Sequence, residues 1–101
     1  MATRTTVLVH GNPESSAIWE PLTAALAERG RGDVAALSPP GFGAAVPDGF
    51  DPTIANYADW LVGELGAVRA GGAEIDLLGH DWGAGHVYGA LSRRPDLVRT
   101  W

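Results

Sequence analysis

Hydrophobic residues form three short and nearly continuous runs along the chain, at residues 5–9, 33–37 and 75–78. Val, Ile, Leu and Ala dominate these runs, and apolar positions do not alternate regularly with polar ones. This pattern is typical of strands that are covered on both faces, as in a parallel sheet. The sequence therefore predicts three parallel strands, joined by the longer stretches that separate the runs.

The stretch after the first run has apolar residues at helical spacing. We expect a helix that begins at Ser15 or Ser16, either of which can cap it, and that ends near Arg29. Pro21 falls in or near the first turn, where its missing N–H does little harm, and Gly30 follows the expected end. The expected apolar side consists of Ile18, Trp19, Leu22, Ala25 and Leu26.

A second helix is expected from Ile54 to about Arg69, with Thr53 as its amino-terminal cap and Gly71 just beyond its end. The apolar side of this helix should consist of Ile54, Tyr57, Leu61, Leu65 and Val68. A third helix should follow the last strand, and Pro95 should break it or begin its exit loop.

The alternation of strands and helices predicts an α/β fold, with a parallel sheet and helices on both of its faces. Right-handed crossovers would place the carboxyl ends of all three strands along one edge of the sheet. The loops at residues 10–13, 40–43 and 79–83 should therefore lie together at that edge. Open α/β sheets bind their ligands in the crevice at this edge.

The most informative stretch is Gly79-His80-Asp81-Trp82-Gly83, which ends the third run and opens the last helix. A turn this sharp strains the backbone of its central residue, and Gly79 and Gly83 remove side chains that would clash. A carboxylate there is ionised near neutral pH, so it needs no neighbouring base to act as a nucleophile. It suits an electrophilic carbon with a good leaving group, as in an alkyl halide or an epoxide. The alternative is that Asp81 only caps the helix.

Composition narrows the range of partners and compartments. The chain has 101 residues and a net charge of −5, which argues against nucleic acid or an anionic membrane as a partner. It contains no cysteine, which excludes disulfides and thiolate chemistry and fits a cytoplasmic location. The apolar run at residues 7–9 is too short for a signal peptide or a membrane span.

These motifs give the chain a resemblance to the α/β hydrolases, and more narrowly to their haloalkane dehalogenase and epoxide hydrolase branch. Residues 10–13, His-Gly-Asn-Pro, resemble the oxyanion loop of that branch, and residues 79–83 resemble its aspartate elbow. The resemblance implies that Asp81 is the nucleophile and that the backbone N–H groups of Asn12 and Trp82 form the oxyanion hole. It also implies that the side-chain N–H groups of Asn12 and Trp82 hold a departing halide. The loop and elbow glycines are Gly11, Gly79 and Gly83.

Alternatives stay open at this stage. Epoxide hydrolases usually carry an aromatic residue at the position of Asn12, which favours a dehalogenase-like hydrolase and leaves an epoxide hydrolase as the alternative. A second alternative is a non-catalytic or uncharacterised binding protein of the same fold. In that case Asn12 would be a turn residue and Trp82 a packing aromatic. The branch usually has an Asp near the end of the second strand, where this chain reads Ser38-Pro39-Pro40, and often a Ser where this chain has Ala44. These departures leave room for a different subfamily, including an esterase-like one.

None of the three histidines matches the general base of the branch, which follows much later in the sequence. His10 stands where the branch has a structural histidine, His80 should point away from the nucleophile, and His86 lies one turn into the last helix. Asp81 is the only carboxylate near ligand spacing, so we expect no metal site and no cofactor.

A complete α/β-hydrolase domain is well over 101 residues long, and a further strand is expected to start near residues 99–101. We therefore expect residues 1–101 to be a partial hydrolase core, the amino-terminal part of a longer protein. The general base and any cap domain would lie in the remaining part. The substrate of the whole protein should be a small apolar organic molecule, which the 101 residues alone should not turn over.

Overall fold

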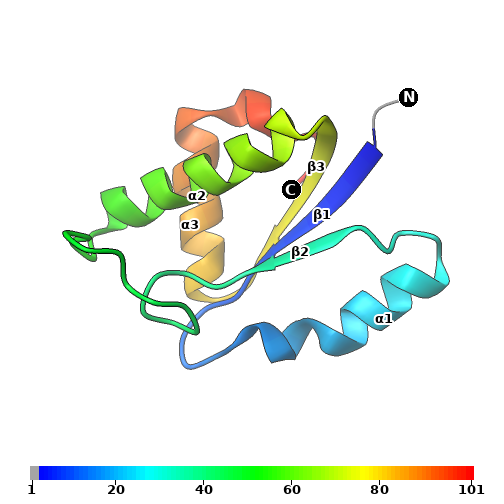
Figure 1. The fold of residues 1–101 in the computed structure, drawn as a ribbon, viewed down its shortest axis with the longest axis horizontal. Coiled ribbons are helices and arrows are strands. Elements are labelled where there is room, and N and C mark those ends of the chain that lie inside the picture. The colour runs from blue at the N-terminus through cyan, green and yellow to red at the C-terminus, as the bar shows by residue number, and fades with distance from the viewer. Residues whose placement is uncertain (1–2) are drawn as a thin grey trace.

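The computed structural model describes residues 3–101 and shows a three-stranded sheet flanked by helices (Figure 1). The strands are β1 (Thr3–Val9), β2 (Val34–Leu37) and β3 (Ala73–Gly79). Their order in the sheet is β2-β1-β3, and both pairs are parallel. The predicted α/β class is therefore confirmed. The first and third strands begin two residues earlier than expected, because Thr3 and Ala73 already pair in the β1–β3 ladder.

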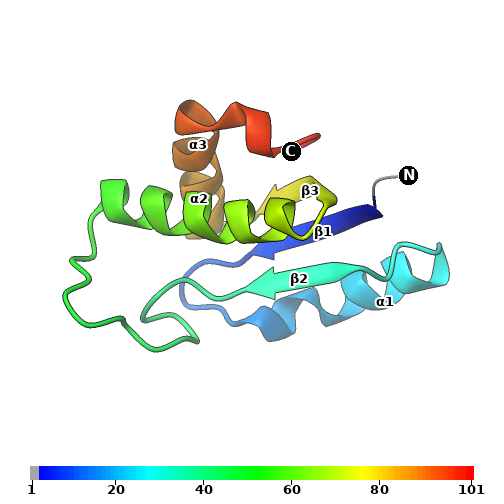
Figure 2. The ribbon, with the colours of Figure 1, turned by 45° about the horizontal axis from the view of Figure 1, so that its top comes forward.

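The helices cover both faces of this sheet (Figure 2). The 3₁₀ turn η1 (Ser16–Trp19) and the helix α1 (Glu20–Glu28) lie on one side. The helices α2 (Ile54–Ala70) and α3 (Trp82–Arg93) lie on the other side, and η2 (Pro95–Leu97) follows α3. Within residues 3–101, no helix combines the length and the apolar character that a membrane crossing needs.

The first helix differs from the prediction because it is divided into two parts. Ser15 caps the 3₁₀ turn through a hydrogen bond from the Ala17 N–H, and the α-helix begins only at Glu20. Pro21 explains the division, since it has no N–H for the bond to residue 17 that a continuous α-helix would require. It stands in the first turn of α1, as expected.

The main core lies between the sheet and the pair α2 and α3. Its buried members are Val7, Val9, Leu61, Leu65, Ile75, Leu77, Val87, Ala90 and Leu97. The predicted cap of α2 is confirmed, because Thr53 Oγ1 accepts a hydrogen bond from the Asn56 N–H at 3.1 Å. Two residues assigned to apolar helix sides are instead exposed, Ile18 at 40% and Ile54 at 79%. Both stand in the first turn of their element, and Ile54 lines a cavity.

The segment after η2 turns back along β3. The Arg99 N–H donates to the Ile75 carbonyl at 2.8 Å, and the Leu77 N–H donates to the Thr100 carbonyl at 2.9 Å. Asp76 and Thr100 form a parallel bridge. Residues 99–101 thus run beside β3 in the manner of a starting fourth strand, as the sequence led us to expect.

Candidate active site

The carboxyl ends of β1 and β3 bring two loops together at one edge of the sheet. Val9 and Gly79, the last residues of the two strands, pair in register. The His80 N–H then donates to the Val9 carbonyl at 3.1 Å, which holds the start of the elbow against the end of β1. The loop that begins at His10 and the elbow at Asp81 are therefore neighbours, as the predicted topology requires (Figure 1).

Asp81 has the strained backbone expected of an elbow residue. Its φ is 59° and its ψ is −127°, and within residues 3–101 it is the only residue other than glycine with a positive φ. A Cβ on Gly79 would lie 2.6 Å from the Gly83 carbonyl oxygen, and a Cβ on Gly83 would overlap the Val9 carbonyl. Both glycines are thus required by close backbone contacts. Asp81 occupies the N-cap position of α3 without the extended backbone and the side-chain capping hydrogen bond that are usual for a capping residue.

The Asp81 carboxylate is bound by backbone N–H groups from both loops. Its Oδ2 atom accepts a hydrogen bond from the Asn12 N–H at 3.0 Å. Hydrogen bonds from the backbone N–H of Asn12 and then of Trp82 hold the pKa of Asp81 below its usual value, despite the opposing effect of partial desolvation. The carboxylate is therefore ionised near neutral pH, and the groups that stabilise it most are uncharged backbone dipoles.

Gly11 is the point at which the two loops touch. A Cβ at this position would lie 2.5 Å from Asp81 Oδ2 and 2.6 Å from the Trp82 backbone nitrogen. Any larger residue would have to push the elbow away from the oxyanion loop. The absence of a side chain at Gly11 is therefore what allows this loop to lie against both the Asp81 carboxylate and the Trp82 backbone nitrogen.

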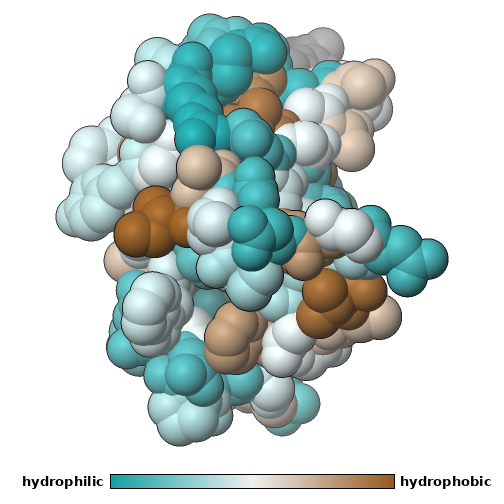
Figure 3. All heavy atoms as spheres, turned by 90° about the vertical axis from the view of Figure 1, so that its left-hand side faces the viewer, coloured by the Kyte–Doolittle hydropathy of each residue, from teal (hydrophilic) through white to brown (hydrophobic). Residues whose placement is uncertain are grey.

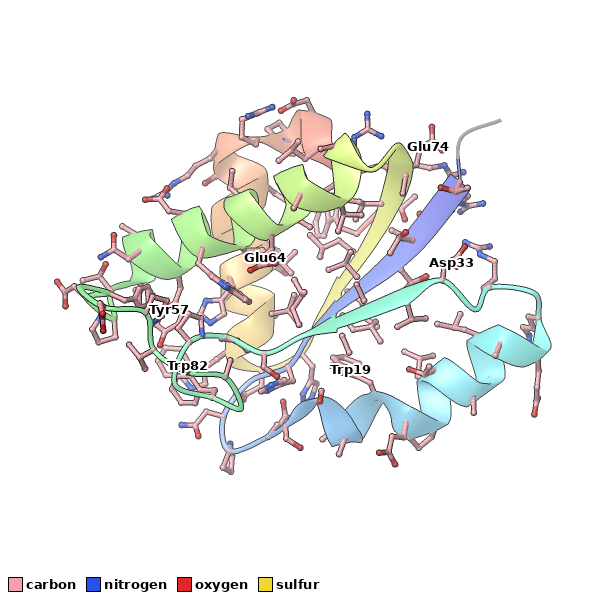
Figure 4. The ribbon with its side chains drawn as sticks, in the orientation of Figure 1. Trp19, Asp33, Tyr57, Glu64, Glu74 and Trp82 are labelled. Carbon is pink, nitrogen blue, oxygen red and sulfur yellow. The ribbon has the colours of Figure 1, made fainter. Side chains whose placement is uncertain are left out.

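An apolar cavity of about 320 Å³ opens beside this pair of loops. It is lined by Asn12, Phe42, Pro52, Ile54, Tyr57, Trp82, Gly85 and His86. Figure 4 shows Tyr57 and Trp82 at the same end of the molecule, and Trp82 remains 60% exposed. On the face at this end, hydrophobic residues form separate patches among polar ones (Figure 3).

The three histidines occupy different positions around the site. His10 is fully buried, its Nδ1 donates to the Gly11 carbonyl at 2.9 Å, and its Nε2 contacts Ser38 Oγ at 3.1 Å. Ser38, one of the departures from the branch, thus supports the oxyanion loop through His10. Tyr57, which the sequence placed only in the helix core, stacks on the buried His86 with ring centroids 4.7 Å apart.

Glu14 is the residue that sequence reasoning missed. Its Oε1 accepts a hydrogen bond from the Gly11 N–H at 2.7 Å, and its Oε2 lies 2.7 Å from His80 Nδ1. The only signal in the sequence was its position two residues after Asn12, which gives no reason to pair it with His80. Among residues 3–101, no group of three or more His, Cys, Asp or Glu side chains is placed to hold a metal ion.

The sequence of this chain is similar to individual known proteins and to the profile of a protein family. Over 93 residues the chain is 38% identical to the protein named "Probable oxidoreductase EphD" of Mycobacterium bovis, and equally to that of Mycobacterium tuberculosis. The match covers 90% of this chain but only 15% of those relatives. No solved structure matches at comparable strength. The profile described as "Alpha/beta hydrolase family" matches residues 6–99, so this chain belongs to the α/β-hydrolase family.

Proposed function

We propose that the protein containing this chain is a hydrolase in which Asp81 attacks the carbon of a small haloalkane and forms an alkyl ester. The observation that carries the proposal is the Asp81 carboxylate, which stands on a strained turn and is bound only by backbone N–H groups. No cation neutralises it directly, so its charge remains available to an electrophile. The apolar cavity beside the loops fits a small organic substrate.

The proposed reaction has two halves. Asp81 Oδ1 attacks the carbon, the carbon–halogen bond breaks, and the halide leaves with the bonding pair toward the side-chain N–H groups of Asn12 and Trp82. Both residues line the cavity, and both carry uncharged donors. Water then loses a proton to a general base and attacks the carbonyl carbon of the ester, and the negative charge that develops on Oδ2 is stabilised by the Asn12 and Trp82 backbone N–H groups. The intermediate collapses, the bond between that carbon and Oδ1 breaks, and the alcohol leaves with Oδ1 and a proton from the base, which restores the carboxylate. The water needs a general base, and we expect that base to come from the part of the protein outside residues 3–101.

An epoxide is the second candidate substrate, and the described residues favour it less. Opening an epoxide places negative charge on an oxygen that must receive a proton. The phenol that lines the cavity belongs to Tyr57, and its hydroxyl already donates to the Pro40 carbonyl at 2.7 Å. Asn12 and Trp82 already place side-chain N–H donors at the cavity for a halide. Epoxide opening would in addition need an acid from outside residues 3–101.

We propose no oxidoreductase activity for this chain, although its relatives are named "Probable oxidoreductase EphD". The match spans a small part of those proteins. The sequence also has no Gly-x-Gly-x-x-Gly loop between a strand and a helix, the arrangement that binds dinucleotides.

The proposal is tested by isotope labelling of the full-length protein. A single turnover of 1-bromobutane in H₂¹⁸O should give unlabelled butanol, because the alcohol oxygen comes from Asp81. The ¹⁸O should appear in the peptide that contains Asp81. Labelled butanol after one turnover would show direct attack by water, and no bromide release by the folded protein would favour the binding-protein alternative. Parallel assays with styrene oxide would identify an epoxide hydrolase.

The halide site has its own test. Bromide should quench part of the tryptophan emission saturably, and Trp82→Phe should remove the saturable part. Trp101→Phe is the matched control, because Trp101 is 70% exposed and does not line the cavity. Purely linear quenching in the parent would count against a halide site.

A further inference from the structure

The Glu14 carboxylate joins the oxyanion loop to the elbow. One of its oxygens accepts from the Gly11 N–H and the other contacts His80 Nδ1, both at 2.7 Å. The Glu14 side chain is only 18% exposed, although His80 is 61% exposed. The hydrogen bond from Gly11 and then that from His80 hold the pKa of Glu14 below its usual value, against the repulsion from Asp81. We call this arrangement the Glu14–His80 bridge.

The peptide between Gly11 and Asn12 decides where the Asn12 N–H points. The Gly11 carbonyl accepts from His10 Nδ1 at 2.9 Å and from the Glu14 N–H at 3.3 Å. In a planar trans peptide the C=O and the N–H point in opposite directions. Holding the Gly11 carbonyl therefore aims the Asn12 N–H at the other side, where it meets Asp81 Oδ2.

Gly11 needs this support because glycine has the widest backbone freedom of any residue. A side chain, which would restrict that freedom, is excluded by the contacts with Asp81 and Trp82. Glu14 fixes Gly11 from both sides, through its carboxylate on the N–H and its own N–H on the carbonyl. His80 in turn anchors that carboxylate to the residue next to the nucleophile.

We propose that the Glu14–His80 bridge positions the Asn12 N–H and thereby controls hydrolysis of the alkyl ester more than its formation. This inference rests on the proposed function of Asp81. Its physical reason is that full negative charge develops on Oδ2 only when water attacks the ester. An oxyanion-hole donor that is misaimed loses much of its value at that step, whereas attack by Oδ1 on carbon needs it less. Glu14 and His80 are thus positioning residues and do not contact the reacting atoms.

The test compares disruptive and conservative variants of the full-length protein with 1-bromobutane. Glu14→Leu and His80→Ala remove the bridge. Glu14→Gln keeps an acceptor for the Gly11 N–H, and His80→Asn keeps a donor near the place of Nδ1. Glu28→Gln, an exposed carboxylate change on α1, is the matched control.

In the disruptive variants, ester hydrolysis should slow by about tenfold, while bromide release in the first turnover slows by less than about threefold. The alkyl ester on Asp81 should then accumulate and appear as added mass of the intact protein. The conservative variants and Glu28→Gln should behave like the parent. Equal slowing of both halves would indicate a merely structural role and overturn the inference, and unchanged kinetics in both disruptive variants would do so too.

A readout that needs no turnover separates this inference from the proposed function. In Glu14→Leu the Asn12 N–H should bind Asp81 less well, so the pKa of Asp81 measured by ¹³C NMR should rise, even though loss of the repulsion between the two carboxylates acts to lower it. If the parent releases no bromide, the proposed function fails. The titration of Asp81 then still tests whether the Glu14–His80 bridge positions the Asn12 N–H. An unchanged or lowered Asp81 pKa in Glu14→Leu, with the parent fold retained by circular dichroism, would overturn it.

Discussion

Asp76 and Asp81 lie on one strand-to-helix segment, yet the structure surrounds them differently. Asp76 contacts the guanidinium groups of Arg4 and Arg31 at 3.0 Å and of Arg99 at 3.2 Å, and it accepts from the Thr100 hydroxyl. Asp81 has no such cation and accepts hydrogen bonds from backbone N–H groups. Asp76 therefore ties neighbouring segments of the sheet together, whereas the charge of Asp81 is, under the proposed function, available to an electrophile.

Both carboxylates have a lowered pKa, but for different reasons. Burial acts to raise the pKa of Asp76, and the Thr100 hydroxyl with the Arg4 and Arg99 guanidinium groups more than offset it. The pKa of Asp81 is lowered mainly by the Asn12 N–H and next by the Trp82 N–H. A low pKa alone therefore does not identify a nucleophile. The two carboxylates differ in what stabilises them, a hydroxyl and guanidinium groups for Asp76 and chiefly backbone N–H groups for Asp81.

The comparison is tested most strongly by Asp81→Asn. This change should lower the rate of bromide release by at least about 10³-fold, because an amide is not a nucleophile toward carbon. The melting temperature should change little, since Asn retains an acceptor for the Asn12 N–H. Steady-state kinetics and thermal melts of the full-length protein check both parts. Substantial remaining activity would mean that another group carries the reaction.

Gly11→Ala sharpens the comparison by disturbing only the catalytic end. The new Cβ would lie within 2.6 Å of Asp81 Oδ2 and of the Trp82 nitrogen, so the two loops must separate. We expect a loss of about 10²-fold in ester hydrolysis, measured in the same assay. The matched control is Gly63→Ala in α2, where a Cβ meets nothing within 4 Å. That control should stabilise the helix by about 0.5–1 kcal/mol and leave activity unchanged.

Asp76→Asn tests the opposite end of the comparison. It removes the negative charge that the three guanidinium groups share, so the free energy of unfolding should fall by about 2 kcal/mol. Activity per folded molecule should stay within about threefold of the parent. Urea denaturation and bromide-release assays measure the two quantities. A large loss of activity at unchanged stability would contradict the assignment of Asp76 to structure.

The smallest effect concerns pH and His86. Burial lowers the pKa of His86 below its ordinary value, so the folded state binds fewer protons there than the unfolded state does. This contribution to stability is present above the ordinary histidine pKa and is lost as pH falls from that value toward the lowered one. Asp76 and Asp81 lose their contributions only near and below the ordinary aspartate pKa, at more acidic pH.

The corresponding experiment compares melting temperatures of the parent and His86→Phe from pH 7 to pH 5. The parent should lose more stability over this range than the variant, which keeps an aromatic ring against Tyr57. Identical slopes in the two proteins would show that His86 titrates normally.

The sequence predicted local structure correctly where a local rule allowed only one arrangement of the backbone. The strands, the Thr53 cap and the elbow glycines follow from hydrophobic runs, capping chemistry and backbone crowding, and each has its counterpart in the structure. The first helix was predicted less well, because Pro21 divides it. Ile18 and Ile54 were misplaced, because helical periodicity does not tell where along a helix the contact with the sheet ends.

The sequence by itself determined the α/β class, the position of the elbow and the acid at its centre, because these depend on residues close together in the chain. Only the tertiary structure decided how the two loops meet. The contact of Gly11 with Asp81, the aim of the Asn12 N–H and the link between Glu14 and His80 join residues far apart in sequence. They exist because parallel pairing places the ends of β1 and β3 side by side, a register that no local pattern specifies.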